Sequence, residues 1–408
     1  MKCGLLGRRL GHSYSPQIHS HLGDYSYELF EKEPEELEDF LKNSDWTGVN
    51  VTIPYKKDVI PYLDELSPVA KRLGAVNTIV RREDGTLFGH NTDYFGFRSM
   101  VAKSGIQPAG KKCLILGTGG ASATAQAAME ELGANVVVIS RSGENNYDNL
   151  HLHADAAVIV NTTPVGMYPN TGSAPLDVTR FPHLEGVLDV VYNPARTQIL
   201  LDAENMGVKT MNGLWMLVGQ AKEAAEYFTG TKIDDSVIGK IHHILRRQME
   251  NIVLIGMPGC GKSTVGQALA AQTGKTVVDA DEEIIRLAGK PIPQIFAEDG
   301  EEVFRAWETK ALDTLGKRSG LIIATGGGCV TRAENYPLLH QNGSIFWIKR
   351  DIEKLPTDGR PLSQSGKLQQ MYQIRKPMYE RFADHTVSND GALESTIQTI
   401  IHILEGSI

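Results

Sequence analysis

A glycine-rich turn at residues 256–264 constrains the fold of this chain more than any other segment. The turn reads Gly-Met-Pro-Gly-Cys-Gly-Lys-Ser-Thr, follows the apolar run 252–255 and leads into a helical pattern that ends near residue 272. In a phosphate-binding loop of this form, backbone N–H groups surround the phosphates, the lysine reaches the β and γ oxygens and the serine binds Mg²⁺. The sequence therefore predicts an α/β domain that binds a nucleoside triphosphate with Mg²⁺. The predicted nucleotide-binding residues are Gly256, Gly259, Cys260, Gly261, Lys262, Ser263 and Thr264.

A second glycine-rich turn, at residues 117–122, reads Gly-Thr-Gly-Gly-Ala-Ser and separates the apolar run 113–116 from a helical pattern. This order is typical of a Rossmann fold, in which the cofactor pyrophosphate lies on the helix N-terminus. The next predicted strand ends in Ser140-Arg141-Ser142, where NAD-binding chains usually place an acidic residue. An arginine between two hydroxyls suits a 2′-phosphate, so NADP is favoured over NAD; a solvated loop arginine is the alternative. The predicted cofactor-binding residues are Gly117, Thr118, Gly119, Gly120, Ala121, Ser140 and Arg141.

Short apolar runs alternate with helical patterns along all 408 residues, which predicts an α/β fold with parallel strands in two or three domains. We expect an α/β substrate-binding domain at 1–105, a Rossmann-type dinucleotide-binding domain at 106–247 and a phosphate-binding-loop domain at 250–408. The chain is expected to return to the first domain near 220–247. A helix over 234–249 is expected to join the last two domains, since no Gly/Ser/Pro-rich linker lies there.

Composition excludes several classes of protein. The net charge of −8 disfavours a sequence-independent grip on nucleic acid. No apolar run approaches the ~20 residues of a membrane helix. The four cysteines, Cys3, Cys113, Cys260 and Cys329, lie too far apart in sequence for a zinc ribbon or a disulfide scaffold, so a reducing cytoplasm fits best. The sequence gives no indication of the oligomeric state.

Polar residues cluster in four segments of the first domain, at 12–16, 50–56, 75–78 and 91–93. Each segment follows a predicted strand or begins a helix, and ligands bind at that edge of an open α/β sheet. Lys56 and Asp93 form a pair that can move a proton to or from an alcohol oxygen. The alternatives are a helix cap for Asp93, turn roles for Ser13 and Ser15, and a solvated surface charge for Lys56.

These segments, the Gly-Thr-Gly-Gly-Ala-Ser turn, Val-Tyr-Asn-Pro at 191–194 and Asn-Gly-Leu-Trp-Met-Leu-Val-Gly-Gln at 212–220 together resemble shikimate dehydrogenase over nearly all of 1–247. The resemblance implies that Lys56 and Asp93 are the catalytic pair. It implies a substrate site for shikimate or 3-dehydroshikimate formed by Ser13, Ser15, Thr52, Lys56, Asn77, Asp93, Tyr192 and Gln220, and adds Val190 and Gly213 to the NADP(H) site. Ser15 favours shikimate over quinate, since relatives that accept quinate tend to have Thr there. The stretch between Arg141 and Asn161 is short for the family.

Residues 250–408 resemble shikimate kinase through the phosphate-binding loop, Asp279-Ala280-Asp281, Thr325-Gly-Gly-Gly328, Arg360-Pro-Leu and Arg375-Lys-Pro-Met-Tyr379. The resemblance implies that ATP binds at the loop, that Ser263 and Asp279 hold Mg²⁺, and that Lys262, Asp281 and Arg360 are catalytic. The substrate residues that it implies are Asp281, Arg305, Gly327, Gly328 and Arg375. The segment before Arg360 is short and lacks the arginine that the family usually places against adenine; Lys354 is the nearest basic residue.

The expected function is a bifunctional enzyme that reduces 3-dehydroshikimate with NADPH and phosphorylates the shikimate formed with MgATP. Two alternatives stay open. The kinase-like half is a non-catalytic or weakly active module, or the first half is a quinate/shikimate dehydrogenase.

Overall fold

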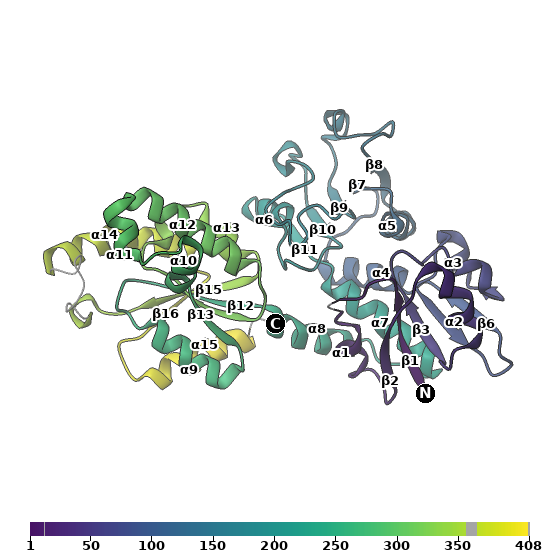
Figure 1. The fold of residues 1–408 in the computed structure, drawn as a ribbon. Coiled ribbons are helices and arrows are strands. Elements are labelled where there is room, and N and C mark those ends of the chain that lie inside the picture. The colour runs from purple at the N-terminus through teal and green to yellow at the C-terminus, as the bar shows by residue number, and fades with distance from the viewer. Residues whose placement is uncertain (12, 356–364, 407–408) are drawn as a thin grey trace. The chain divides into compact units, whose positions relative to one another are not determined.

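The computed structural model describes residues 1–11, 13–355 and 365–406. The chain forms two compact units (Figure 1). Unit 1 consists of Met1–Gly166, Ser173–Tyr192 and Ile199–Ile244, and unit 2 of Met167–Gly172, Asn193–Gln198 and Leu245–Ile408. Unit 1 contains two sheets and unit 2 contains one.

The first sheet of unit 1 is mixed, with the strand order β2-β1-β3-β5-β6-β4. Its strands are β1 (Lys2–Gly7), β2 (Ser26–Glu31), β3 (Gly48–Val51), β4 (Glu65–Leu66), β5 (Thr78–Arg81) and β6 (Leu87–His90). Strand β5 runs antiparallel to both β3 and β6. Its accompanying helices are α1 (Ser15–His19), α2 (Leu37–Asn43), α3 (Pro68–Leu73) and α4 (Asp93–Ser104). Because β5 is reversed, the residue before it and the residues after β3 and β6 meet at one edge of the sheet.

The second sheet of unit 1 is parallel, with the order β11-β10-β9-β7-β8. Its strands are β7 (Lys112–Leu116), β8 (Asn135–Ile139), β9 (Val158–Asn161), β10 (Gly186–Asp189) and β11 (Lys209–Met211), with the helices α5 (Gly120–Glu131) and α6 (Gln198–Asn205). This arrangement is a Rossmann-type sheet. Between β8 and β9 the chain forms an isolated bridge between Ser140 and Asn146 and a 3-10 helix at Leu150–His153; this is the stretch noted as short in the sequence.

Helix α7 (Leu214–Thr229) carries the chain from the second sheet back to the first. The helix packs along α4 and contacts β3 and β5. The contact with β3 is close, because a Cβ on Gly48 would lie 2.2 Å from the Phe228 ring. The return matters for function because α7 brings residues near 220 to the edge of a sheet formed before residue 91.

Unit 2 contains a parallel sheet with the order β13-β14-β12-β15-β16. The strands are β12 (Asn251–Ile255), β13 (Thr276–Asp279), β14 (Leu321–Ala324), β15 (Gly343–Lys349) and β16 (His385–Ser388). The helices are α9 (Lys262–Thr273), α10 (Ala280–Ala288), α11 (Ile292–Glu298), α12 (Gly300–Gly316), α13 (Asn335–His340), α14 (Ser365–Phe382) and α15 (Leu393–Gly406). Apart from the buried Asn251, the central strands β12 and β14 are apolar and almost fully buried, as expected for a sheet covered on both faces.

Helix α8 (Ser236–Met249) leads directly into β12. Its last carbonyl groups accept hydrogen bonds from the Lys275 ammonium, which donates to the carbonyl oxygens of Arg247, Gln248 and Glu250 at 2.7, 3.0 and 2.8 Å. A lysine at this position satisfies carbonyls that have no partner within the helix. Burial lowers the pKa of Lys275 to about 8. In the described part of the chain, no helix is long and apolar enough to cross a membrane.

Candidate active sites

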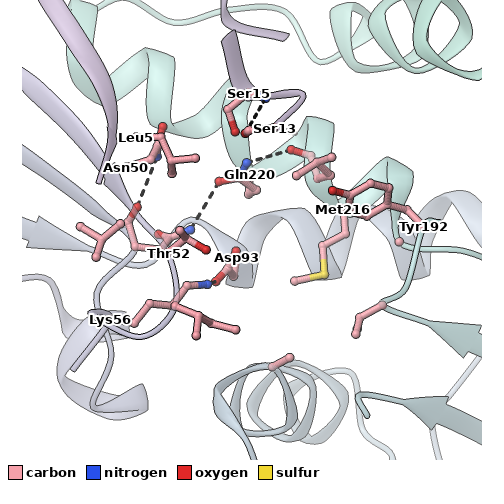
Figure 2. A pocket seen from close by; sticks show the side chains of 17 residues that line it. Leu5, Ser13, Ser15, Asn50, Thr52, Lys56, Asp93, Tyr192, Met216 and Gln220 are labelled. Atoms are coloured by element: carbon pink, nitrogen blue, oxygen red, sulfur yellow. Dashed lines mark hydrogen bonds and ion pairs between the residues drawn. The ribbon is translucent and has the colours of Figure 1, made fainter. Parts of the chain in front are cut away.

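Unit 1 has a cavity of about 350 Å³ at the edge of the first sheet (Figure 2). The eight substrate residues predicted from the sequence all line it: Ser13, Ser15, Thr52, Lys56, Asn77, Asp93, Tyr192 and Gln220. Three residues predicted for the cofactor, Ala121, Val190 and Gly213, line it as well. The structure thus brings the substrate set and part of the cofactor set into one cavity.

Lys56 and Asp93 form an ion pair in the cavity wall, with 2.6 Å between Nζ and Oδ2. Figure 2 shows the two side chains pointing at each other, Lys56 from the turn that follows β3 and Asp93 from the start of α4. Their side chains are 29% and 17% exposed, so the pair is partly shielded from water. The carboxylate does not cap α4, whose N-cap residue is Thr92 and has no side-chain cap. The Asp93 carboxylate therefore pairs with Lys56 instead of capping the helix.

The amide side chains of Asn77 and Gln220 are held by hydrogen bonds beside this pair. Asn77 Oδ1 accepts a bond from the Thr92 backbone N–H at 2.7 Å, and Asn77 Nδ2 donates to Thr92 Oγ1 at 3.0 Å and to Gln220 Oε1 at 3.4 Å. Gln220 Nε2 donates to the Leu217 carbonyl at 2.9 Å. Both amides therefore present fixed donors and acceptors to a polar ligand in the cavity.

Two hydroxyl-bearing segments complete the cavity. The Ser15 N–H donates to Ser13 Oγ at 3.2 Å, so the turn role considered for Ser13 exists alongside its place in the lining. Tyr192 packs edge-on against Tyr14, with ring centroids 6.2 Å apart. Burial, with a smaller contribution from Tyr14, raises the pKa of Tyr192, so its phenol remains a neutral donor at physiological pH.

Asn50 and Met216 also line the cavity, although neither is among the predicted site residues. Asn50 could have been predicted from its spacing: it lies two residues before Thr52 at the end of β3, and alternate residues of a strand share a face. Met216 lies four residues before Gln220, which places the two on one face of α7.

The glycine turn between β7 and α5 can accommodate a pyrophosphate. An added Cβ at Gly119 or Gly120 would meet no atom within 4 Å, and α5 begins at Gly120 with its first N–H groups at the turn. Ser122 Oγ donates to the Gly117 carbonyl at 2.7 Å and fixes the turn; Thr118 lies within it. After β8, Ser140 Oγ accepts from the Gly143 N–H at 2.8 Å, and Arg141 is exposed beside it.

The phosphate-binding loop of unit 2 connects β12 to α9, as the motif predicts. The Lys262 ammonium is buried over the loop and donates to the carbonyls of Gly256 and Met257 at 2.9 and 3.1 Å. Gly261 has a φ of +100° and a Cβ there would lie 2.6 Å from Asn389 Nδ2, so this position requires glycine. Gly259, Cys260 and Thr264 lie in the same turn and first helical turn.

The two residues predicted to hold Mg²⁺ lie next to each other. Ser263 Oγ donates to Asp279 Oδ2 at 3.4 Å. The other Asp279 oxygen accepts from the Asp281 N–H at 2.9 Å and caps α10. A hydroxyl beside a carboxylate at the end of a neighbouring strand is a donor set that suits Mg²⁺.

Three predicted kinase residues, Asp281, Arg305 and Arg375, gather around the glycine turn 326–328. A Cβ on Gly326 would lie 3.2 Å from Asp281 Oδ1, and one on Gly328 would lie 2.2 Å from Arg305 Nη1. Arg375 Nη1 donates to the Gly327 carbonyl at 3.1 Å. An aspartate and two arginines therefore face one turn that has no side chains of its own. Arg360 lies outside the described residues.

Glu308 is a further member of this cluster that the sequence analysis missed. Arg305 donates to Glu308 at 2.8 Å and to Glu301 at 3.0 Å. Glu308 is 1% exposed, and its Oε1 would lie 2.8 Å from a Cβ on Gly326. Burial raises the pKa of Glu308, and Arg305 opposes this. The contact could have been predicted from its spacing, because Glu308 lies three residues after Arg305 on a helix and residues at that spacing are neighbours on the helix surface.

Comparisons with known proteins identify both halves. A family model described as shikimate dehydrogenase substrate binding domain matches residues 5–79, and one described as shikimate kinase matches residues 258–405. Shikimate dehydrogenase (NADP(+)) from Clostridium perfringens is 37% identical over 265 residues, which cover 60% of this chain and 97% of the relative.

Solved structures agree. The crystal structure of shikimate dehydrogenase 1 from Peptoclostridium difficile has 41% identity and a TM-score of 0.55, covering 60% of this chain and 97% of that one. Shikimate 5-dehydrogenase from Thermus thermophilus, in complex with NADP(H) and shikimate, has 31% identity and a TM-score of 0.54, covering 60% and 99%. The chain therefore belongs to the shikimate dehydrogenase family over its first part and continues into a shikimate kinase domain, so that two enzymes of one pathway are fused in a single polypeptide.

Proposed function

We propose that unit 1 reduces 3-dehydroshikimate to shikimate and that unit 2 phosphorylates shikimate to shikimate 3-phosphate, each with the residues described above. NADPH supplies the hydride and MgATP the phosphoryl group when they are bound. The observation that carries the proposal is the 2.6 Å ion pair between Lys56 and Asp93 in a cavity lined by hydroxyl and amide side chains. A polyhydroxylated ring acid offers complementary partners for every one of those groups.

In unit 1, Lys56 acts as the general acid. Its ammonium stabilises negative charge on the substrate carbonyl oxygen and then donates a proton to it. Asp93 holds the ammonium in place through the ion pair and accepts a hydrogen bond from a substrate hydroxyl. Ser13 and Ser15 bind the carboxylate, while Asn77 and Gln220 orient the ring hydroxyls.

In unit 2, Asp281 accepts the proton of the attacking hydroxyl, and Arg305 and Arg375 bind the substrate carboxylate. Arginine suits this role because its planar guanidinium pairs with a carboxylate through two hydrogen bonds. Lys262 and the loop N–H groups hold the phosphates, and Ser263 and Asp279 hold Mg²⁺. Glu308 fixes Arg305 beside the turn 326–328.

The two alternative functions are not favoured. The chain matches a shikimate kinase family model from residue 258 to 405 and NADP-dependent shikimate dehydrogenases over 60% of its length. The direct test supplies the purified chain with 3-dehydroshikimate, NADPH and MgATP and follows products by mass. Shikimate without its phosphate would support the non-catalytic kinase module, and faster turnover of quinate than shikimate with NADP⁺ would support the quinate enzyme. The four free cysteines fit a reducing compartment such as the cytoplasm.

Arg141→Ala is expected to raise the KM for NADP⁺ roughly ten- to hundred-fold, the value of one charge-assisted hydrogen bond to the 2′-phosphate. The KM for NAD⁺, which lacks that phosphate, should change little. Initial rates of shikimate oxidation with each cofactor measure both constants. Arg180→Ala, which changes an exposed arginine at the end of the 3-10 helix Val178–Arg180 in the same predicted domain, serves as the control. An equal rise for both cofactors would contradict the assignment of Arg141 to the 2′-phosphate.

As the pH is lowered, the kinase reaction is expected to lose activity at a higher pH than it would if the titrating aspartate had an ordinary pKa. Burial and the neighbouring Asp279 raise the pKa of Asp281 above the usual 3.8. The protonated acid cannot accept the hydroxyl proton, so the rate falls as the pH falls through this raised pKa. The pH profile of kcat/KM for shikimate measures the acid limb. Samples returned to neutral pH must recover full rate, which separates titration from unfolding.

The same profile in Asp279→Asn provides the control. Measured at saturating Mg²⁺, since Asp279 also belongs to the proposed Mg²⁺ site, removal of the neighbouring charge should move the acid limb to lower pH, because one of the two causes of the shift is lost; the Asn oxygen can still cap α10. An acid limb that stays in place would show that another group titrates.

A further inference from the structure

A cluster of aromatic side chains lies behind the wall of the unit 1 cavity. His19 stacks on Tyr27, with ring centroids 4.0 Å apart and planes 11° from parallel, and packs edge-on against Tyr25 at 5.9 Å. The Tyr25 hydroxyl and His19 Nδ1 are 2.7 Å apart. Burial lowers the pKa of His19 to about 3, so the ring is neutral. The residues that line the cavity include neither tyrosine.

The two tyrosines differ in what their hydroxyl groups reach. The Tyr27 hydroxyl donates to Asn50 Oδ1 at 2.7 Å, and Asn50 does line the cavity. Asn50 Nδ2 donates in turn to Thr78 Oγ1 at 3.1 Å and to the Asn77 carbonyl at 3.3 Å. Since a phenol donates to the amide oxygen, Tyr27 determines which end of the Asn50 amide faces Asn77. The burial of Tyr27 raises its pKa well above 10, so this donor persists at any physiological pH.

From Asn50 the hydrogen bonds continue to the substrate residues. Thr78 Oγ1 donates to Asn77 Oδ1 at 3.2 Å, and Asn77 Nδ2 donates to Gln220 Oε1 at 3.4 Å. Asn50, Thr78 and Asn77 are 4%, 1% and 3% exposed. Water therefore has little access to replace a lost hydrogen-bond partner. A change in the orientation of the Asn50 amide would change the hydrogen bonds that hold Asn77.

We infer that Tyr27 is a positioning residue of the dehydrogenase: through Asn50 it fixes the amide groups that orient the substrate, although it does not touch the substrate. The inference rests on the proposed dehydrogenase function of this cavity. It assigns to Tyr27, which bonds Asn50 directly, a larger effect on substrate affinity than to its neighbour Tyr25, which is linked to Asn50 only through His19.

Tyr27→Phe removes the hydroxyl and keeps the ring that stacks on His19. We expect the KM for shikimate, measured by NADP⁺ reduction without ATP, to rise about tenfold, the effect of one buried hydrogen bond, with kcat within about twofold. Tyr25→Phe is the matched control: it also removes one tyrosine hydroxyl and its bond, but that bond is to His19, so Asn50 keeps its direct bond from Tyr27. Its KM should change less than twofold. A dehydrogenase kcat close to that of the parent shows that unit 1 of each variant is folded.

A double-mutant cycle with Asn50→Ala separates positioning from packing. If Tyr27 acts through Asn50, Tyr27→Phe should leave the KM nearly unchanged in the Asn50→Ala background. The same factor in both backgrounds, or equal effects of Tyr27→Phe and Tyr25→Phe, would overturn the inference. A parent chain without dehydrogenase activity would overturn the proposed function itself, whereas an active parent with an unchanged Tyr27→Phe KM would overturn only the role of Tyr27.

Discussion

Lys56→Ala will lower the rate of 3-dehydroshikimate reduction by about 10²–10⁴, the usual scale for a positioned general acid. The substitution removes the ammonium that donates the proton. It also leaves the Asp93 carboxylate, 17% exposed, without its cation next to the oxygen on which negative charge develops. Like charge beside that oxygen raises the barrier further, so the loss should fall mainly on kcat. Stopped-flow or steady-state oxidation of NADPH at saturating substrate measures it.

The chain offers two controls for this experiment. Lys57 is exposed and does not line the cavity, so Lys57→Ala removes the neighbouring positive charge and should retain full rate. The kinase reaction of the Lys56→Ala chain should also be unchanged, because Asp281 and the phosphate-binding loop belong to the other unit. A Lys56→Ala chain that keeps more than a tenth of the parent kcat would rule out Lys56 as the proton donor.

The part of the site that could be predicted from the sequence is the part formed by short segments at strand ends. Ser13, Thr52 and Asp93 each follow a strand of the first sheet, and strand ends meet at one edge, so their convergence follows from the strand pattern. The phosphate-binding loop was predictable for a similar reason, since the motif contains its own strand, turn and helix.

Residues whose role depends on long-range packing could not be predicted. Tyr27 faces Asn50 only because β2 pairs with β1 in a register that the sequence does not specify. Glu308 reaches Gly326 only because α12 packs beside the glycine turn that follows β14. Asn389, after β16, donates to the Cys260 carbonyl at 2.8 Å, although 129 residues separate the two. Hydrophobic periodicity indicates which face of an element is buried but not which partner it meets.

Lys262→Ala will abolish most of the kinase reaction, with an expected fall in kcat of about 10²–10³, the effect of removing one preorganised donor from a developing charge. The Lys262 ammonium lies over the loop, held by the carbonyls of Gly256 and Met257, and is therefore placed where the phosphates enter. The KM for ATP should rise as well, because the lysine also contacts the phosphates before transfer. A coupled assay of ADP release with shikimate present measures both constants.

Loss of the ammonium also leaves two loop carbonyls without this donor, so unit 2 should unfold at a lower temperature in Lys262→Ala. Lys262→Arg keeps the positive charge and the hydrogen-bond donors, but its guanidinium does not fit a loop built around an ammonium. Comparison of its unfolding temperature with its kinase rate tests whether the instability explains the kinetic loss. Lys310→Ala, an exposed position on α12, controls for removal of a lysine from this unit. Dehydrogenase turnover should be equal in all three variants, and a matching fall in both reactions would show that the two sites do not work independently.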